Sequence, residues 1–488
     1  MISSDEFCRL ATDFNVIPLS KTLLADLHTP VSAYLSLRSE KALSFLFESA
    51  EPDEKIGRYS FIGIDPEKLL IGRGDRTEIV SNSESRHITQ DILKTLRRET
   101  AHFRVYGKEG GFQGGFVGYL GYNCVRLIEQ IPVPPGSQDE PPDAMFGLFT
   151  TVVQFDHRQH RVTVRVNVVV NDAVPLATQY DRARKKLDLT LLRLRNAPVP
   201  SSHFQCTIPP APSDEAGYCA AVEKAKHHIH EGDMFQAVLS RKRSIPYDGD
   251  PFVVYRALRF VNPSPYLFYV DFGKTKLIGS SPEVLVRVTR GNVELLPIAG
   301  TRKRGITEAE DLELEKELLA DAKETAEHVM LVDLGRNDVG RISAIGSVEV
   351  PVFKRVDRYS HVMHLVSHVR GSLRSDLTPL DALISCFPAG TVSGAPKVRA
   401  MEIINELEGE RRGIYAGAVG YLGFDGTLDT CIAIRTIVGH NGTLTIQSGA
   451  GIVADSVPAT EYRETVNKAQ ALLDAITLAA GGLHDPRD

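Results

Sequence analysis

Residues 416–448, AGAVGYLGFDGTLDTCIAIRTIVGHNGTLTIQS, decide the fold class of this chain. They contain three strand-like runs, at 416–423, 428–438 and 443–448. The connections FDGT and GHNG are too short for a crossover, so neighbouring strands must run antiparallel. A helical pattern at 459–480 follows. Antiparallel strands with helices placed outside them predict an α+β protein.

The rest of the chain has the same mixture on both sides of a proline-rich segment. Further predicted elements include a strand at 275–288 and a long helix at about 308–334. The segment NAPVPSSHFQCTIPPAPSD holds five Pro and three Ser, and it cannot form a helix or a central strand. We therefore predict an N-terminal region at 1–195, a linker at 196–213 and a C-terminal region at 214–480.

Composition and charge exclude several classes of protein. The 488 residues are 42% hydrophobic and 24% charged, with a net charge of −6, and they show neither a basic stripe nor an acidic tail. The six cysteines form no CxxC pair, which argues against a zinc ribbon. Because no secretory signal pattern and no 18-residue apolar run occur, we expect a cytoplasmic protein without a membrane span. The chain contains no tryptophan.

Two pairs of glutamates lie at helical spacing in two separate helices. Glu324 and Glu327 form one pair, and Glu461 and Glu464 form the other. Residues three apart share one helix face. If the two helices converge, the four carboxylates repel one another unless a cation lies between them, and oxygen ligands favour Mg²⁺. The alternative is that both pairs lie on solvated helix faces.

Two glycine-rich loops are suited to binding an anion. FPAGTVSGAPK at 387–397 ends at the start of a helix, and QSGAGIVADS at 447–456 follows a strand. Small residues let backbone N–H groups approach a negative charge. The second loop matches G-x-G-x-x-A, but Pro458 falls where the helix of a dinucleotide fold would run, so a carboxylate cradle fits better. The alternative for each loop is an ordinary tight turn.

A histidine-rich strand and one arginine are further candidates. YSHVMHLVSHV at 359–369 alternates as a strand, with His364 and His368 on one face and His361 on the other. No HExxH motif supports zinc, whereas one strand histidine facing a pocket is suited to carrying a proton. Arg435 lies inside the apolar run CIAIRTIV, where its charge requires either a bound anion or an internal salt bridge.

Several long motifs in fixed order resemble the chorismate-utilising enzymes. These motifs are PIAGTRKRG (297–305), KETAEHVMLVDLGRNDVGR (323–341), HLVSHVRG (364–371), FPAGTVSGAPK, YAGAVGYLG (415–423), IAIRT (432–436), SGAGIVADS and EYRETVNKA (461–469). LFESAEPDEKIGRYSFIG (46–63) and NPSPYLFY (262–269) extend the resemblance, to the anthranilate synthase large-subunit family, over the N-terminal half. The resemblance implies a large antiparallel β-sandwich with helices packed outside.

The resemblance also implies roles for the matching carboxylates. Glu327 and Glu464 would bind Mg²⁺ directly, and Glu324 and Glu461 would act through water. The metal would neutralise the ring carboxylate of chorismate. Glu283, in SSPEVL, would be the general acid that protonates the departing C4 hydroxyl.

Other matching residues are implied to hold the substrate. The residues for the enolpyruvyl carboxylate are Tyr415, Arg435, Gly449 and Gly451, with Lys468 nearby, and those around the ring are Thr301, Thr391 and His364. The family links His364 to the later loss of pyruvate.

Two positions indicate which nucleophile is used. Members that add water to the ring carry a lysine where this chain has Gln236, which fits ammonia as the nucleophile. Aminodeoxychorismate synthases carry a nucleophilic lysine in P-I-K-G-T, whereas this chain has Ala299, which cannot attack the ring. Together, Gln236 and Ala299 indicate ammonia attack at C2 and formation of anthranilate.

Partners and regulation are implied by the same resemblance. No cysteine lies in a G-x-C-x-G nucleophile turn, so a separate glutamine amidotransferase subunit would supply the ammonia. Tryptophan would inhibit by binding an LLES-like element and the N-P-S-P-Y segment. The matching residues are Glu48, Ser49, Pro263, Ser264, Pro265 and Tyr266. Phe47 and Leu267 replace the usual Leu and Met by other apolar residues, so we expect inhibition to be retained.

Two alternatives to an anthranilate synthase remain open. An aminodeoxyisochorismate synthase of a phenazine-type pathway would keep Gln236 and Ala299 but would not release pyruvate. A non-catalytic chorismate- or tryptophan-binding regulatory protein would be expected to lack some of the catalytic residues, and all of them are present.

Overall fold

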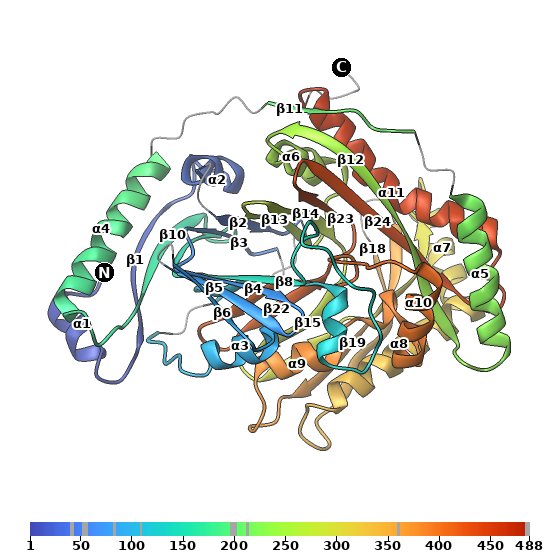
Figure 1. Ribbon diagram of the computed structural model, residues 1–488, viewed down its shortest axis with the longest axis horizontal. Helices are drawn as coiled ribbons and strands as arrows, with labels where there is room; N and C mark the ends of the chain where they lie inside the picture. Colours follow the sequence, from blue (N-terminus) through green and yellow to red (C-terminus); the bar gives the residue numbers. More distant parts are fainter. Residues whose placement is uncertain are drawn as a thin grey trace.

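Two large antiparallel sheets form the centre of the molecule (Figure 1). The computed structural model describes residues 1–39, 43–50, 57–81, 84–107, 110–195, 203–210, 214–358 and 362–483. The first sheet contains, in spatial order, β1 (Val16–Leu24), β10 (Arg161–Val169), β9 (Thr151–Asp156), β3 (Tyr59–Ile64), β2 (Ser44–Glu48), β13 (Tyr266–Phe272), β14 (Thr275–Ser281), β23 (Thr436–His440), β24 (Thr443–Ile452), β12 (Gln236–Gly249) and β11 (Phe204–Cys206), with β20 (Gly394–Ala395) beside β12. The second contains β17 (Ile298–Lys303), β19 (Val362–Ser372), β16 (Asn292–Leu295), β15 (Val284–Thr289), β22 (Leu428–Ile432), β21 (Ala418–Gly423), β7 (Gly115–Leu120), β8 (Ala144–Phe149), β4 (Lys68–Arg73), β5 (Arg76–Ser81) and β6 (Glu84–Ile88), with β18 (Glu349–Arg358) beside β19.

Helices lie outside the sheets. Those packed on the first sheet are α1 (Ser4–Leu10), α2 (Pro30–Leu37), α4 (Leu176–Arg195), α5 (Glu215–His230), α6 (Phe252–Val261), α10 (Lys397–Glu408) and α11 (Pro458–Ala480). Those beside the second are α3 (Ile92–Thr100), α7 (Glu308–Ala320), α8 (Ala322–Gly340) and α9 (Pro379–Cys386). The predicted α+β fold, a β-sandwich with helices packed outside, is confirmed.

The inner faces of the two sheets meet in an aromatic core. Phe45 and Phe268 reach it from the first sheet, and Tyr119 and Phe149 from the second. The Phe45 and Phe149 rings meet edge to face with their centroids 4.8 Å apart, an arrangement that aromatic pairs prefer. Burial of such rings at the sheet interface holds the sandwich together.

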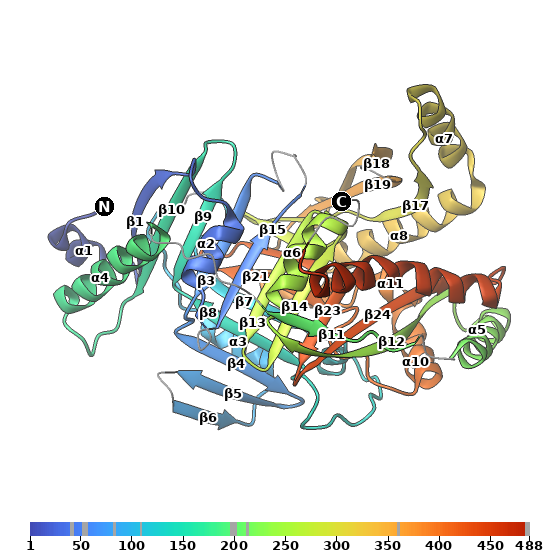
Figure 2. The same cartoon turned by 90° about the horizontal axis from the view of Figure 1, so that it is seen from above.

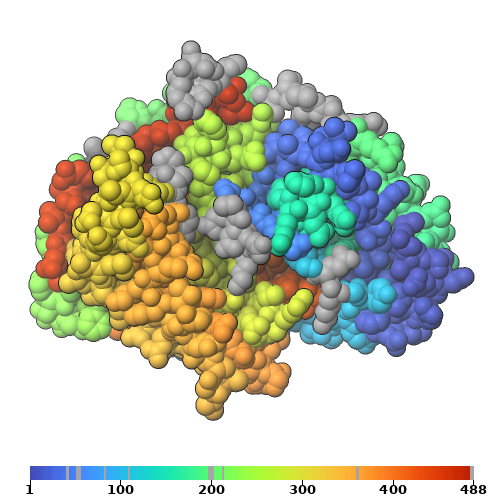
Figure 3. Space-filling view, turned by 180° about the vertical axis from the view of Figure 1, so that it is seen from behind, coloured from blue at the N-terminus to red at the C-terminus, as the bar shows by residue number. Residues whose placement is uncertain are grey.

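Both sheets contain strands from both predicted regions of the chain. β2 of the N-terminal region pairs with β13, and β7 pairs with β21. N-terminal and C-terminal segments accordingly lie against each other in the space-filling view (Figure 3). The two regions therefore share one sandwich, while the domain boundaries drawn from the sequence remain a prediction.

The middle of the predicted linker is an edge strand. Residues 203–210 include β11, which pairs with the end of β12 and buries Phe204 in the core. An edge position is compatible with the prolines around it, because an edge strand has one side without ladder hydrogen bonds. The other residues of the predicted linker, 196–202 and 211–213, lie outside the described ranges.

Two predicted strands are each divided between the two sheets. The run at 275–288 is β14 in the first sheet and β15 in the second, with Pro282 and Glu283 between them. The run at 428–438 is β22 in the second sheet and β23 in the first, and Arg435 lies in the crossing with φ of +49°. The two crossings are joined, since Ile432 N–H donates to the Glu283 carbonyl at 3.0 Å.

The predicted long helix is interrupted at Asp321. The Asp321 carboxylate accepts hydrogen bonds from the N–H groups of Lys323 and Glu324 and so caps the start of α8. Helix α7 projects from the body of the molecule, and α8 lies against β17 and β19 (Figure 2). The break therefore separates an exposed helix from the one that carries Glu324 and Glu327. Among the helices of the described ranges, none is both long and apolar enough to span a membrane.

Candidate active site

Glu283 lies at the crossing from β14 to β15 and faces the loop 387–397. The Thr391 hydroxyl donates a hydrogen bond to Glu283 Oε1 at 2.9 Å. Burial raises the pKa of Glu283 to about 7, against the lowering effects of Thr391 and of the more distant Lys468 ammonium. A carboxyl with this pKa holds a proton near neutral pH and can donate it to a leaving group.

The loop that carries Thr391 is a short 3₁₀ turn, Gly390–Val392, followed by β20 and α10. Thr391 and Glu283 line a small cavity together with Leu331 and Leu334 of α8. The loop predicted to bind an anion thus presents a side-chain hydroxyl to the candidate acid.

His364 faces the strand that carries Thr301. His364 Nδ1 lies 3.1 Å from the Gly300 carbonyl and 3.1 Å from Thr301 Oγ1. Burial lowers the pKa of His364, and the Gly300 carbonyl opposes part of this effect. An imidazole of lowered pKa is neutral at pH 7, with Nδ1–H available for the carbonyl. His361 lies outside the described residues, and His368 Nε2 lies 3.5 Å from a carboxylate oxygen of Glu294.

The residues predicted to bind the enolpyruvyl carboxylate converge on β24. The Lys468 ammonium donates to the Gly449 carbonyl at 3.0 Å, and Arg435 Nη1 donates to the Lys468 carbonyl. A Cβ added to Gly449 would lie 2.7 Å from the Tyr415 hydroxyl, so the two residues are adjacent. Burial lowers the pKa of Arg435 and raises that of Tyr415 to about 12. Within the described ranges Arg435 forms no ion pair, which leaves an anion as the interpretation of its charge.

We expect Gly449→Ala to impair substrate binding. The added methyl group would lie 2.7 Å from the Tyr415 hydroxyl and 2.8 Å from the Leu239 carbonyl. Overpacking of this kind costs ~1–3 kcal/mol, so KM for chorismate should rise about 10- to 100-fold. Gly439→Ala is the matched control, because its nearest neighbour would be 3.4 Å away. Steady-state kinetics of both variants would test this, and equal KM values would contradict it.

Polar side chains lie beside the carboxylates of the two glutamate pairs. Gln236 Nε2 lies 3.5 Å from Glu327 Oε1, and the Lys468 ammonium lies 2.6 Å from Glu464 Oε1. Arg302 Nη1, which the sequence did not single out, donates to Glu324 at 3.2 Å. Gln236 is also close to β24, since a Cβ on Gly451 would lie 2.6 Å from its Nε2.

The electrostatics of these carboxylates indicate mutual repulsion. Burial raises the pKa of Glu327, and the charges of Glu324 and Glu464 raise it further. Burial and the charge of Glu464 likewise raise the pKa of Glu461. The charge of Glu464 on α11 thus acts on Glu327 on α8, so the two pairs lie near each other, a convergence that the sequence left open. In the part of the chain that the structure describes, however, no three acidic, His or Cys side chains form a group close enough to hold a metal ion.

Two buried ion pairs near the site were not predicted. Lys397 Nζ donates to Asp338 at 2.7 Å and joins the start of α10 to the end of α8. Arg412 pairs with Glu408 at 2.7 Å and is almost completely buried. In the sequence these residues appear only as charged residues within the segments LGRND, GAPK and GERRG. Nothing in the neighbouring sequence indicates that their charges are buried.

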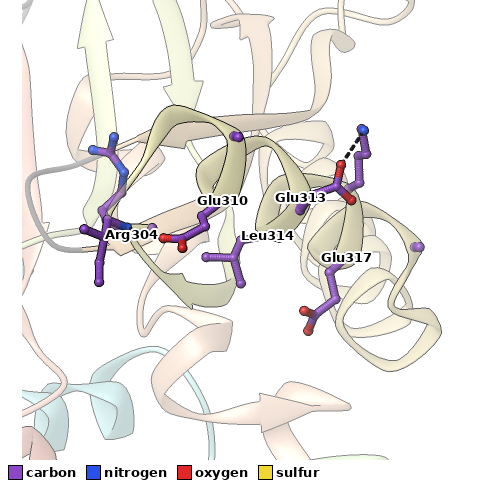
Figure 4. A pocket seen from close by; sticks show the side chains of 10 residues that line it. Arg304, Glu310, Glu313, Leu314 and Glu317 are labelled. Atoms are coloured by element: carbon purple, nitrogen blue, oxygen red, sulfur yellow. Dashed lines mark hydrogen bonds and ion pairs between the residues drawn. The ribbon is translucent and has the colours of Figure 1, made fainter.

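A hollow along α7 is separate from these residues (Figure 4). Arg304, Glu310 and Glu317 lie around it, and none of the predicted site residues lines it. This hollow belongs to the exposed helix and plays no part in the candidate site.

Four of the six residues predicted to bind tryptophan line a second pocket, which lies between the two sheets. Glu48, Ser49, Pro265 and Tyr266 line it from the first sheet, and β21 and β22 close it from the second. Ser264 lies beside this group, since its carbonyl accepts from Ala50 N–H at 3.1 Å, while Pro263 is exposed and does not line the pocket.

Polar contacts fix two of the pocket residues. Glu48 is buried and accepts hydrogen bonds from the Tyr255 hydroxyl at 2.5 Å and from Arg259 at 3.0 Å. The Tyr266 hydroxyl donates to Asp429 at 2.8 Å and so joins the two sheets across the pocket.

Comparisons with known proteins identify the family. The family described as chorismate binding enzyme matches residues 43–474. Anthranilate synthase component 1 from Acetivibrio thermocellus is 45% identical over 97% of both chains, and that from Pseudomonas aeruginosa is 45% identical over 98% of this chain and 99% of the relative. The chain belongs to the anthranilate synthase component 1 group of the chorismate-binding enzymes.

Solved structures of this family agree with the fold. Anthranilate synthase component I from Streptococcus pneumoniae has a TM-score of 0.74 and 38% identity, covering 92% of this chain and 98% of its own. The isochorismate synthase MenF from Escherichia coli, at TM-score 0.69 and 20% identity, covers 97% of this chain and 98% of its own and shares the fold. The predicted family, and with it the role of an anthranilate synthase large subunit with chorismate-utilising lyase activity, is confirmed.

Proposed function

We propose that this chain converts chorismate and ammonia to anthranilate and pyruvate. Ammonia adds at C2 of the ring, the C4 hydroxyl departs with a proton, and elimination of pyruvate then makes the ring aromatic. The observation that supports this most directly is Glu283, a buried carboxyl with a pKa of about 7 that accepts a hydrogen bond from Thr391. This carboxyl donates the proton that the departing hydroxyl needs.

The chain's own residues bind and orient the substrate. Tyr415 and Arg435 hold the enolpyruvyl carboxylate against the backbone of Gly449 and Gly451, whose missing side chains let Tyr415 and Gln236 approach β24 closely. Lys468, on the Gly449 carbonyl, adds positive charge to the same place. Thr301, Thr391 and His364 line the ring, and the neutral His364 can accept the proton that is lost with pyruvate.

Mg²⁺ is the proposed cofactor. The carboxylates of the two pairs could supply the oxygen ligands that Mg²⁺ takes, and the raised pKa values of Glu327 and Glu461 support this proposal, because a divalent cation would relieve the repulsion that contributes to them. Glu327 and Glu464 would bind it directly and Glu324 and Glu461 through water, which fits the few direct carboxylates that Mg²⁺ accepts. When bound, the ion neutralises the ring carboxylate of chorismate.

Gln236 and Ala299 support ammonia as the nucleophile. The Gln236 amide is buried beside Glu327 and cannot remove a proton from water, whereas ammonia attacks without such a base. The Ala299 side chain, on β17, has no group that could attack the ring. The name component 1 implies a partner component for the relatives. We propose that the corresponding partner of this chain is a glutamine amidotransferase subunit that supplies the ammonia.

A single assay tests the reaction. The purified chain is incubated with chorismate, Mg²⁺ and an ammonium salt at about pH 8, where part of the ammonium is deprotonated, and anthranilate fluorescence and pyruvate are followed together. Both products should appear with ammonium and neither with glutamine alone. Amination without pyruvate would instead indicate an aminodeoxyisochorismate synthase, and no reaction would indicate a regulatory protein.

Tryptophan is the proposed inhibitor, and the pocket between the sheets is its proposed site. Phe47, Phe61 and Tyr421 offer apolar surface for an indole, and Glu48 offers a carboxylate for an ammonium group. Strand β22 joins this pocket to the acid, because Asp429 and Cys431 line the pocket and the next residue, Ile432, donates to the Glu283 carbonyl. Since the chain contains no tryptophan, the fluorescence of added tryptophan reports binding directly.

We expect Ser49→Ala to weaken inhibition without affecting catalysis. Loss of one hydrogen bond in a buried site costs ~1–2 kcal/mol, so the inhibition constant for tryptophan should rise about tenfold. Ser36→Ala, on α2 and outside the pocket, is the control. Initial rates at increasing tryptophan would show the change. An unchanged inhibition constant in Ser49→Ala, or no inhibition of the unmodified chain, would contradict the assignment.

A further inference from the structure

Arg412 is a buried arginine placed behind the candidate site, shortly after the end of α10. Its side chain is almost completely inaccessible to solvent. Its Nε donates to Glu408 Oε2 at 2.8 Å and its Nη2 to Glu408 Oε1 at 2.7 Å. This bidentate pair accounts for the charge, which would otherwise be very costly in the interior.

The remaining donors of Arg412 reach two segments that carry site residues. Nη1 donates to the Val392 carbonyl at 2.7 Å, directly after Thr391. Nη2 also donates to the Val238 carbonyl, two residues after Gln236 on β12. The guanidinium carbon lies 5.6 Å from the ring centroid of Tyr415, within the range of a cation–π contact.

Glu408 connects this arginine to the strand that carries Gly449. Its Oε1 accepts from both the N–H and the hydroxyl of Ser240, each at 2.7 Å. Ser240 pairs with Gly449 across β12 and β24. The Arg412–Glu408 pair therefore connects the segments of Thr391, Gln236 and Gly449, which are far apart in the sequence.

We propose that Arg412 is a positioning residue that holds the Thr391 turn, the Gln236 strand and the Tyr415 ring in one arrangement around the substrate. The proposal rests on the proposed function for the identity of that substrate. Arginine is suited to this role because its planar fork donates in several fixed directions at once, whereas lysine is a point charge on a flexible stem. A lysine at 412 can keep the charge beside Glu408, but it cannot also satisfy Val392 and Val238 with the same geometry.

The first test compares Arg412→Lys with a neighbour. Small displacements of catalytic groups cost about 100-fold in rate, so we expect kcat of Arg412→Lys to fall by about that factor, and kcat/KM to fall further because KM for chorismate rises when Tyr415 shifts. Arg411→Lys is the matched control, since the Arg411 side chain pairs with Asp143 and Glu140 instead. Thermal unfolding followed by circular dichroism establishes that each variant is folded.

A double-mutant cycle with Thr391→Ala separates positioning from general stabilisation. If Arg412 acts through the Thr391 turn, Arg412→Lys should lower kcat by about 100-fold in the unmodified enzyme and far less in Thr391→Ala. Equal losses in the two backgrounds, or an unchanged kcat in folded Arg412→Lys, would overturn the proposal. Should Arg412→Lys not fold, Glu408→Gln keeps an acceptor for the guanidinium and should show the same non-additivity. Anthranilate formation by the unmodified chain tests the proposed function separately.

Discussion

Glu283→Gln is expected to lower kcat about 10²- to 10⁴-fold, the usual contribution of a general acid. Glutamine has nearly the same shape and can still accept the Thr391 hydrogen bond at 2.9 Å, so the site should keep its geometry. What it lacks is a proton to donate to the departing C4 hydroxyl. Stopped assays of anthranilate and pyruvate would measure the loss, and KM for chorismate should change little. A variant with more than a tenth of the normal kcat would contradict the assignment.

The pH dependence gives an independent test of the same residue. With a pKa of about 7, the Glu283 carboxyl is protonated below pH 7 and loses its proton above it. The reaction rate divided by the concentration of free NH₃ should therefore fall about tenfold per pH unit above pH 7. This decrease should be absent from the pH profile of Glu283→Gln. Thr391 stabilises the charged carboxylate and lowers its pKa, so Thr391→Ala should move the falling limb to higher pH. Movement to lower pH would contradict this hydrogen bond.

Glu327→Gln is expected to abolish the dependence on Mg²⁺ together with most of the activity. A metal ion that stabilises charge contributes several kcal/mol, so kcat/KM should fall by about 10²- to 10³-fold or more. Glu313→Gln is the control, because Glu313 is exposed on α7 and pairs with Lys316 on the same helix. Titration with Mn²⁺, followed by electron paramagnetic resonance, should show binding to the unmodified chain and weak binding to Glu327→Gln.

The stability of Glu327→Gln gives a readout that does not depend on catalysis. Burial and two neighbouring negative charges raise the pKa of Glu327, so its folded-state pKa lies above the unfolded value. Ionisation of this carboxyl therefore destabilises the metal-free fold. The penalty grows as pH rises from the unfolded pKa to the folded-state pKa and is fully present above it. At pH 8 without metal, Glu327→Gln should melt at or above the temperature of the unmodified chain. Added Mg²⁺ should raise the melting temperature of the unmodified chain only, and an equal rise in both would refute the ligand assignment.

Much of the architecture could be predicted from local patterns. The strands at 161–169 and 418–423 and the helices at 176–195 and 458–480 follow their hydrophobic periods closely. The runs at 275–288 and 428–438 were predicted as single strands and are each two. Periodicity could not reveal the break, because apolar residues face the sandwich interior on both sides of each crossing and the pattern continues through it.

Some residues of the candidate site could be predicted from the sequence, and others could not. Residue types and spacing indicated the two glutamate pairs, the glycine loops and a strand histidine, and the family resemblance assigned Glu283 and His364. Neither singled out Arg302, Arg412 or Lys397. A charged residue in a motif has the same local appearance whether it lies in solvent or in the core. Only the packing of distant segments around it removes the water and requires a partner.

The sequence by itself therefore determined the family, the fold class and which side chains are available for chemistry, because these depend on motif order and local periodicity. The tertiary structure alone decided where those side chains meet. It places Glu283 and Arg435 at the two crossings between the sheets, where the chain leaves one hydrogen-bonding ladder for the other. It also gives Glu283 its raised pKa, because segments brought together only by folding, such as Leu331 and Leu334 of α8 and the 389–391 turn, enclose the carboxyl and suppress its ionisation.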